Sequence, residues 1–257
     1  MKKALVTGGA GFIGSHLVDR LVSEGWSVRV LDNFSSGRVE NVTHHLGNKC
    51  VEALNGDLKD PQNANNAVKG VDVVFHCAAN PEVKVSTTNP EIHFNDNVVA
   101  TFNLLKAMRK GDVKELIFAS SSSVYGEPED LPVSEDAPLK PISIYGASKV
   151  ACEALIHAYS RLYGIRAVVL RYANVVGSRL RHGVIYDLLM KLKVSPNALE
   201  ILGDGKQVRN YMYVDDAIEA TMLAYKKAPG SYEVYKVASE DWLTVDDVVN
   251  IIIEELL

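Results

Sequence analysis

A tyrosine and a lysine stand four residues apart in the stretch YGASK, at Tyr145 and Lys149. Residues with this spacing lie on one face of a helix, so a phenol and an ammonium can act together on one small group. A free tyrosine ionises at about pH 10, and nearby positive charge favours its phenolate form. The pair therefore indicates a base that takes a proton from a hydroxyl group. The same spacing also arises by chance in helices, so the hypothesis depends on the rest of the chain.

Glycines fill a turn near the amino terminus, in TGGAGFIG, where Gly8, Gly11 and Gly14 are three residues apart. The turn lies between a predicted strand and a predicted helix, where glycines let the backbone approach a pyrophosphate at the helix N-terminus. Asp32 ends the next predicted strand, where a carboxylate binds ribose hydroxyls and repels a 2′-phosphate. These features predict a site for NAD rather than NADP. Asp57, after the third strand, is either an adenine contact or a turn-forming aspartate.

Short apolar and β-branched runs alternate with helix-length segments along the first two thirds of the chain. The runs predict buried strands at residues 3–7, 27–32, 50–54, 71–76, 115–120 and 166–172. Segments between them, such as FIGSHLVDRLVSEG and NVVATFNLLKAMRKG, have helical apolar spacing and close on glycine. This alternation predicts right-handed crossovers and an α/β fold with a doubly wound parallel sheet.

The regular alternation loosens after residue 172, which separates the predicted sheet domain from a smaller lobe. We assign residues 1–172 to a Rossmann-type NAD-binding domain, to which residues 208–230 return through the helical segment VDDAIEATMLAYKKA. Residues 173–207 and 231–257 are assigned to a smaller C-terminal lobe, in which YEVYKVA predicts a strand. Thr244, followed three residues later by Asp247, predicts the N-cap of the last helix.

The composition is that of a globular protein, since 47% of the 257 residues are hydrophobic and 23% are charged. A formal net charge of -5 argues against a nucleic-acid partner, because binders of nucleic acid normally have a basic surface. No apolar run is long enough to predict a membrane span. Cys50, Cys77 and Cys152 are far apart, so neither disulfides nor a cysteine zinc site is expected, and a cytoplasmic location fits.

Six motifs follow one another along nearly the whole chain: TGGAGFIG, LDNFSSG, HCAA, SSSSVYG, YGASK and RYANVVG. In this combination the sequence resembles the extended short-chain dehydrogenase/reductase family, and within it most of all the UDP-glucose 4-epimerases and related nucleotide-sugar enzymes. The resemblance implies a tightly bound NAD and a nucleotide-sugar substrate, with a UDP-hexose as the expected one. It makes the smaller lobe the part that binds the nucleotide sugar. Because the family continues further, we expect this lobe to be incomplete at its C-terminus.

The resemblance also implies roles for single positions. The catalytic residues would be Ser121, Tyr145 and Lys149, with the lysine favouring the phenolate and holding the nicotinamide ribose. The expected NAD contacts are Gly8, Gly11, Phe12, Ile13, Gly14, Asp32, Asn33, Ser35, Ser36, Gly37, Asp57, Leu58, Ala78, Ala79, Asn97, Tyr145, Lys149 and Tyr172. The expected substrate contacts are Ser121 and Tyr145 at the sugar, Asn174 and Arg209 at the diphosphate, and Glu200, Ile201 and Leu202 in a strand beside the nucleotide.

The reaction that these roles predict is inversion at C4 of a nucleotide sugar, with UDP-glucose and UDP-galactose interconverted through a 4-keto sugar. Related enzymes that dehydrate or decarboxylate their sugars place acidic residues after the catalytic serine, where this chain has Ser122 and Ser123. This favours epimerisation, with a 4,6-dehydratase or decarboxylase as the alternative. A non-catalytic NAD-binding sensor is a further alternative, because fold alone does not establish function. Retention of Ser121, Tyr145 and Lys149 argues against a sensor.

Other polar residues have plainer interpretations. His76 follows an apolar strand and is predicted to be a hydrogen-bonded structural residue. His44 and His45 form no recognisable metal set with distant carboxylates, so no metal is expected. The basic loop of Arg179, Arg181 and His182 either binds phosphates or is simply solvated. Lys84 is assigned no role, because Pro81 takes the place of the lysine that some epimerases use on nicotinamide.

Relatives pair two subunits through the helices that correspond to residues 95–110 and 145–163. The resemblance therefore implies a homodimer.

Overall fold

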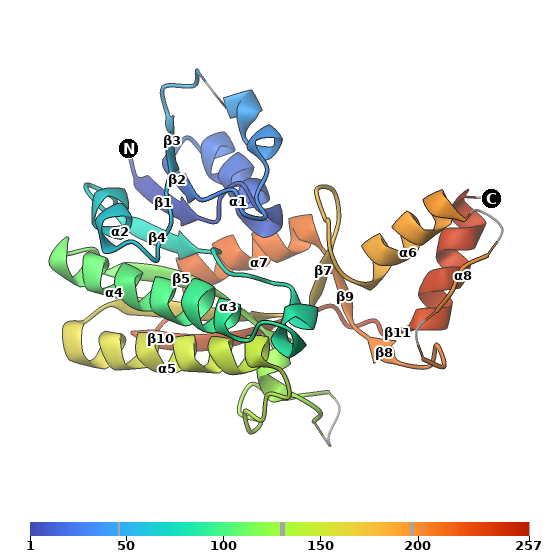
Figure 1. The fold of residues 1–257 in the computed structure, drawn as a ribbon. Helices are drawn as coiled ribbons and strands as arrows, with labels where there is room; N and C mark the ends of the chain where they lie inside the picture. The colour runs from blue at the N-terminus through green and yellow to red at the C-terminus, as the bar shows by residue number, and fades with distance from the viewer. Residues whose placement is uncertain (46, 129–131, 196–197, 202, 257) are drawn as a thin grey trace.

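Seven parallel strands form the central sheet of the computed structural model, which describes residues 1–45, 47–128, 132–195, 198–201 and 203–256 (Figure 1). The strands are β1 (Lys3–Thr7), β2 (Ser27–Asp32), β3 (Val51–Asn55), β4 (Val73–His76), β5 (Glu115–Ser121), β6 (Arg166–Tyr172) and β10 (Tyr232–Val237). Their order across the sheet is β10-β6-β5-β4-β1-β2-β3. The strand order reverses between β1 and β4, and ligands of such sheets bind in the crevice at this point.

Helices cover both faces of the sheet because successive side chains of each strand point to opposite sides. Leu5 of β1 packs on one face with helices α2 (Pro61–Ala67), α4 (Ala100–Lys110) and α5 (Ile144–Tyr163). Ala4 and Val6 of the same strand pack on the other face with α1 (Phe12–Ser23) and α7 (Val214–Lys227). The five inner strands are largely buried from both sides, which explains why they read as continuous apolar runs, whereas the edge strands β3 and β10 are only partly buried.

A smaller lobe stands beside the carboxyl ends of the strands (Figure 1). Its own apolar cluster joins Leu188 of α6 (Val184–Val194) to Val248, Val249 and Ile252 of α8 (Val245–Leu256). Two short strand pairs connect it to the sheet domain: β7 (Asn174–Val176) with β9 (Tyr211–Tyr213), and β8 (Val208–Arg209) with β11 (Leu243–Thr244).

Short helices carry many of the turns around the sheet. They are the 3-10 helices η1 (Val39–Asn41), η2 (Thr43–His45), η3 (Val83–Thr87) and η5 (Ser122–Tyr125), the single turn α3 (Glu91–His93), and the π-helix η4 (Phe94–Val99) that leads into α4. Each of η3, η4 and η5 follows or faces the carboxyl end of a strand, and all three contribute to the site described below.

The doubly wound parallel sheet predicted from the sequence is confirmed. The predicted N-cap of the last helix is also confirmed, since Asp247 N donates to Thr244 Oγ1 at 3.0 Å and Thr244 N donates to Asp247 Oδ2 at 2.8 Å. The assignment of all of residues 231–257 to the smaller lobe is wrong, because residues 232–237 form β10 and extend the sheet beside β6. Residues 208–209 pair with β11, whereas α7, with Met212 before it and Ala228 after it, packs on the sheet.

Among the described residues, no helix is both long and apolar enough to cross a membrane.

Candidate active site

A cavity of about 1590 Å³ opens along the carboxyl ends of the strands and extends to the smaller lobe. It lies over the reversal point between β1 and β4, where the strand order predicts a ligand. Most of the residues expected to bind cofactor or substrate line it: Gly8, Gly11, Phe12, Ile13, Gly14, Asp32, Asn33, Ser35, Ser36, Asp57, Leu58, Ala78, Ala79, Ser121, Tyr145, Lys149, Tyr172, Asn174 and Arg209. The fold thus brings sequence-distant positions into one groove.

The glycine turn provides close backbone approach at the start of α1. Gly8 has φ +66°, and a Cβ there would lie 2.7 Å from the backbone nitrogen of Ala78. A Cβ on Gly14 would overlap the carbonyl oxygen of Gly8, so any larger residue would push the helix off the turn. The N-terminus of α1 has no side-chain cap, and its first turn has no acidic residue. Its backbone N–H groups therefore suit the diphosphate of a dinucleotide.

Asp32 lies at the end of β2 with 7% of its surface exposed. Its two carboxylate oxygens accept hydrogen bonds from the backbone nitrogens of Ala10 at 2.9 Å and Phe34 at 2.8 Å. Burial raises the pKa of this carboxyl above its usual value, although both backbone donors act in the opposite direction. A Cβ on Gly37 would lie 2.7 Å from Asp32 Oδ1, so the loop needs glycine there. The fixed carboxylate fits the hydroxyls of a ribose.

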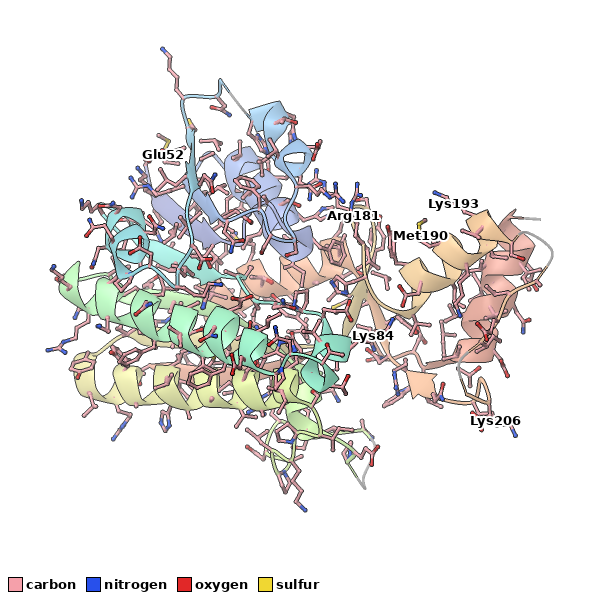
Figure 2. All side chains as sticks on the ribbon, in the orientation of Figure 1. Glu52, Lys84, Arg181, Met190, Lys193 and Lys206 are labelled. Carbon is pink, nitrogen blue, oxygen red and sulfur yellow. The ribbon has the colours of Figure 1, made fainter. Side chains whose placement is uncertain are left out.

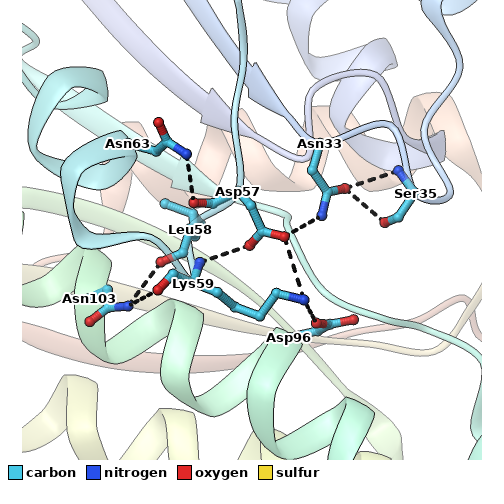
Figure 3. A network of polar contacts seen from close by, with 8 residues as sticks. All are labelled: Asn33, Ser35, Asp57, Leu58, Lys59, Asn63, Asp96 and Asn103. Carbon is cyan, nitrogen blue, oxygen red and sulfur yellow. Dashed lines mark hydrogen bonds and ion pairs between the residues drawn. The ribbon is translucent and has the colours of Figure 1, made fainter.

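A polar network surrounds Asp57 farther along the groove (Figure 3). Asp57 accepts hydrogen bonds from Asn33 Nδ2 at 2.9 Å and from the Lys59 backbone nitrogen at 2.8 Å. Burial raises the pKa of Asp57, but these donors and the Lys59 ammonium lower it overall. Lys59 Nζ lies 2.6 Å from Asp96 Oδ1 of η4, and this contact raises the pKa of the lysine. The loop after β3 therefore presents a charged carboxylate to the groove.

Lys149 is the buried cation of the groove, with 3% of its surface exposed. Its Nζ donates to the carbonyl oxygen of Ala119 at 2.7 Å and lies 5.8 Å from the centre of the Tyr145 ring. No carboxylate of the described residues forms an ion pair with it. Because its charge is not neutralised by an acid, Lys149 can favour a negative charge on the neighbouring phenol.

Ser121 and Tyr145 are positioned by short segments at the ends of β5 and the start of α5. Ser121 caps η5, where its Oγ accepts from the Ser123 backbone nitrogen at 3.2 Å. The backbone nitrogen of Tyr145 donates to Ser86 Oγ of η3 at 3.4 Å. Gly146 allows these parts to meet, since a Cβ there would lie 2.6 Å from the Ser123 carbonyl oxygen.

A buried ion pair lies directly behind this arrangement. Glu153, one turn beyond Lys149, pairs with Arg171 of β6 at 2.7 Å, and both side chains are almost fully buried. Arg171 Nη1 also donates to the Tyr125 hydroxyl at 2.9 Å and to the Glu135 carbonyl oxygen at 2.8 Å. These contacts raise the pKa of the guanidinium despite the opposing effect of burial. Its contacts join β6 to α5, which carries Tyr145 and Lys149, and to η5, which directly follows Ser121.

Two titratable neighbours of Lys149 are uncharged. Burial, with the charge of Lys149, lowers the pKa of His76 to about 3, and its ring nitrogens contact Thr7 Oγ1 at 2.7 Å and Thr101 Oγ1 at 2.9 Å. His76 is therefore the structural residue that the sequence indicated. Burial raises the pKa of Cys77 to about 12, so its thiol is not a nucleophile at neutral pH.

Four of the expected contact residues that are described do not line the cavity. Gly37 lies behind Asp32, and Asn97 is buried behind the wall with 1% exposed. Glu200 and Ile201 lie in the smaller lobe, where they form no strand, and the Glu200 carbonyl oxygen accepts from Lys191 Nζ at 2.9 Å. Leu202 lies outside the described residues. Tyr172 does line the cavity, although its hydroxyl is paired with Thr221 Oγ1 of α7 at 2.5 Å.

Charged residues at the junction of sheet domain and lobe were missed or left undecided by sequence reasoning. Lys84 and Arg181 both line the cavity there (Figure 2). Lys84 Nζ of η3 lies 2.8 Å from Asp187 Oδ2 of α6, an ion pair that bridges the two parts across the cavity. No local pattern in the sequence indicates this contact, because the partners are 103 residues apart.

A second junction cluster surrounds Asp19 of α1. His44 Nε2 and His45 Nε2 lie 2.8 and 2.7 Å from Asp19 Oδ1, so the expectation that these histidines form no recognisable metal set with distant carboxylates is wrong. The three ligand atoms lie within 4.8 Å of one another. Arg179 Nη2 contacts the other Asp19 oxygen at 2.8 Å, and its charge opposes a cation. The cluster therefore functions as an anchor for the loop of Arg179.

Comparison with known proteins identifies a family that the chain matches. Residues 4–238 match the model of the NAD dependent epimerase/dehydratase family. A putative UDP-glucose 4-epimerase of Methanocaldococcus jannaschii is 39% identical over 98% of this chain and 82% of its own length.

Solved structures share the fold over nearly the whole chain. A crystal structure of a UDP-galactose 4-epimerase has a TM-score of 0.91 and 51% identity over 99% of this chain and 83% of that chain. A dTDP-glucose 4,6-dehydratase from Streptomyces venezuelae, DesIV, crystallised as a double mutant with NAD bound, has a TM-score of 0.92 and 28% identity over 98% of this chain and 80% of that chain.

Proposed function

Because the chain belongs to the NAD dependent epimerase/dehydratase family and uses NAD, we propose that it inverts the configuration at C4 of a UDP-hexose, interconverting UDP-glucose and UDP-galactose. The observation that carries the proposal is that Ser121, Tyr145 and Lys149 line one end of a groove that suits a dinucleotide. Lys149 is buried there, and no carboxylate of the described residues forms an ion pair with it. The glycine turn and the Asp32 carboxylate are the parts of that groove that suit NAD.

The residues of the chain would divide the proton chemistry among them. Tyr145, as the phenolate, takes the proton of the sugar 4-hydroxyl, Lys149 favours this phenolate before the transfer, and Ser121 holds the hydroxyl oxygen. Bound NAD supplies a hydride acceptor that is regenerated in each cycle. The configuration at C4 would invert because hydride is returned to the opposite face of the 4-keto sugar, while Tyr145 gives its proton back to the 4-oxygen. The protein thus mainly orients the reactants and adjusts charge.

Inversion requires the sugar to turn while the rest of the substrate stays bound. Arg209 and Asn174 line the lobe side of the cavity and are the proposed diphosphate contacts. Arg209 is exposed, and its guanidinium donates only to the Val208 carbonyl oxygen at 3.0 Å among the described residues. Asn174 Nδ2 donates to the Asn210 carbonyl oxygen at 3.0 Å, which fixes its side chain beside Arg209. A free guanidinium of this kind suits a bidentate phosphate contact.

A 4,6-dehydratase is the second candidate, supported by the similarity to DesIV. Loss of water from C5 and C6 needs an additional acid and base near the sugar. The positions after Ser121 carry the hydroxyls of Ser122 and Ser123, and the buried Ser123 Oγ has no hydrogen-bond partner among the described residues. The site therefore offers hydroxyls where dehydration would need carboxyls.

The reaction is tested by incubating the pure protein with UDP-galactose without added coenzyme and separating the sugar nucleotides. UDP-glucose in the product would support epimerisation with retained NAD. A 4-keto-6-deoxy or decarboxylated sugar would favour the second candidate. Bound NAD with no product would argue against a UDP-hexose as the substrate.

The catalytic assignment predicts the effect of Tyr145→Phe. This variant keeps the ring but loses the group that exchanges the proton, so we expect turnover to fall at least 100-fold, within the roughly 10² to 10⁴ range of general acid–base catalysis. NAD binding should be unchanged, because the groove is otherwise intact. Turnover of the variant near the wild-type rate would disprove the role of Tyr145, and NAD content measured after denaturation is the control for folding.

A further inference from the structure

The two ends of the cofactor groove are connected by the π-helical turn η4. Turns of this type are rare and occur frequently at functional sites. Two consecutive residues of η4 make side-chain contacts in different directions. Asp96 contacts Lys59 near the adenosine end, whereas Asn97 contacts Ser148 of the catalytic helix α5.

The contact on the adenosine side is an ion pair. Lys59 Nζ lies 2.6 Å from Asp96 Oδ1 and 3.5 Å from Asp57 Oδ2 (Figure 3). Asp57 is also held by Asn33 Nδ2 at 2.9 Å, and Asn33, Asp57 and Asp96 all line the groove. The loop that would contact the adenosine is therefore attached to η4 through Lys59.

The contacts on the catalytic side are buried hydrogen bonds. Asn97 is 1% exposed, and its side chain accepts from the Asn80 backbone nitrogen at 2.8 Å and donates to Ser148 Oγ at 2.8 Å. Ser148 Oγ donates in turn to the Tyr145 carbonyl oxygen at 2.7 Å. Because both Asn97 contacts are short and shielded from water, a shift of η4 would move the backbone of Tyr145.

We propose that Lys59 and Asp96 are positioning residues that couple occupation of the adenosine end of the groove to the placement of Tyr145. The inference rests on the proposed function, since it takes Tyr145 as the base and the Asp57 loop as the adenosine contact. The pair is partly exposed, with 41% of the Lys59 and 24% of the Asp96 side chain accessible. The coupling should therefore be about twofold to fivefold, the range that exposed ion pairs supply.

The test uses ADP as the probe and the NAD-free full chain. ADP has the adenosine and a diphosphate but no nicotinamide ribose, so it cannot touch Tyr145 or Lys149. We expect saturating ADP to slow amide hydrogen exchange in the first turn of α5 about twofold to fivefold. In Lys59→Met and in Asp96→Asn, ADP at saturation should leave that exchange unchanged.

A control variant is Lys226→Met, which removes an exposed ion pair with Glu24 at 3.2 Å between α7 and the end of α1. It should keep the full response to ADP. Equal slowing in Lys59→Met and the wild type would overturn the proposal, as would absence of any slowing in the wild type.

Turnover at saturating NAD provides a second readout. Lys59→Met and Ser148→Ala should each lower kcat, and the double variant should be no slower than the slower single variant, because both interrupt one chain of contacts. If the double variant instead loses kcat by the product of the two single losses, the coupling is contradicted. A wild-type protein without turnover would defeat the proposed reaction, whereas the ADP response would still decide the coupling.

Discussion

At the scale of single residues, Asp32 combines a binding role with an unfavourable environment. Its carboxylate is nearly buried, and burial raises its pKa even though two backbone N–H groups favour the charged form. In the folded protein without cofactor, protonation of Asp32 therefore adds stability as the pH falls through this raised pKa. Above it, the charged carboxylate costs stability. The charged form of Asp32, which a ribose contact requires, therefore lowers the stability of the folded protein.

This conflict predicts how NAD binding depends on pH. Ribose hydroxyls donate to the carboxylate, so NAD affinity should decline as acidification protonates Asp32, starting at a higher pH than for an exposed aspartate. The Asp57 carboxyl should stay charged in this range, because its pKa is lowered. Titration calorimetry between about pH 7 and pH 4 measures the effect around the aspartate range.

Asp32→Asn is the matched control for this titration. A hydrogen bond to a charged group contributes about 1.5–3 kcal/mol, so the variant should bind NAD roughly 10- to 100-fold more weakly. Its remaining affinity should not vary with pH in the same range. A wild-type affinity that is flat down to about pH 4 would contradict the assigned role.

At the scale of elements, Gly146 sets how closely α5 approaches the turn that carries Ser121. A Cβ at this position would lie 2.6 Å from the Ser123 carbonyl oxygen and 3.0 Å from Pro141 Cβ. Gly146→Ala should therefore separate Tyr145 from Ser121 and lower kcat by about tenfold, or roughly 1.4 kcal/mol of barrier. NAD affinity should change little, because the glycine turn at β1 is remote from this contact.

In Gly146→Ala, helix propensity acts against the steric effect of the added Cβ, because it favours the variant helix. Alanine is preferred over glycine by about 1 kcal/mol within a helix, so Gly146→Ala alone would strengthen α5. Ala154→Gly, at an exposed position of the same helix, weakens α5 without approaching Ser123. Steady-state kinetics should show slow turnover in Gly146→Ala only. Undiminished turnover in Gly146→Ala together with slow turnover in Ala154→Gly would mean that the stability of α5, and not its approach to Ser123, controls the rate.

The elements also show what the sequence could predict. Apolar runs identified β1, β2 and β6 with their correct ends, because a strand buried on both faces has a strong local pattern. The placement of β10 was wrong, since its half-buried pattern reveals nothing about its partner β6, some 60 residues earlier. The π-helical turn η4 was not predicted either, because it needs no residue types beyond those of the helix around it.

The site was predictable to a similar degree. Motif positions such as Gly8, Tyr145 and Lys149 lie in the groove, because each is fixed by a local strand–turn–helix sequence. Glu200 and Ile201 were expected in a strand beside the nucleotide, and neither lines the cavity. Contacts such as Lys59 with Asp96 and Lys84 with Asp187 depend on the assembled tertiary structure, so no local pattern indicates them.

At the scale of the whole molecule, the cavity is built by two parts of the chain that have separate apolar clusters. The sheet domain would hold NAD, and the lobe of α6 and α8 provides Arg209 and the loop of Arg181. Exposed ion pairs such as Lys84 with Asp187 contribute little energy to this junction, so the two short strand pairs β7–β9 and β8–β11 are its main polar connection.

The outer face of α4 and α5 predicts a homodimer. Large apolar side chains are exposed on these helices and on η4, which leads into α4: Phe102 is 40%, Leu162 71% and Phe94 of η4 57% accessible. A stable interface buries about 800 Å² on each partner, which two long helices can supply by packing against their copies. Light scattering should therefore give twice the 28.1 kDa mass of the chain.

Phe102→Glu would place a charge in this interface and should shift the mass toward the monomer, because an unpaired buried charge is costly. Leu223→Glu is the control, since Leu223 is 55% exposed on α7, on the opposite side of the sheet, and its variant should remain a dimer. A monomer mass for the unmodified protein would exclude the pairing.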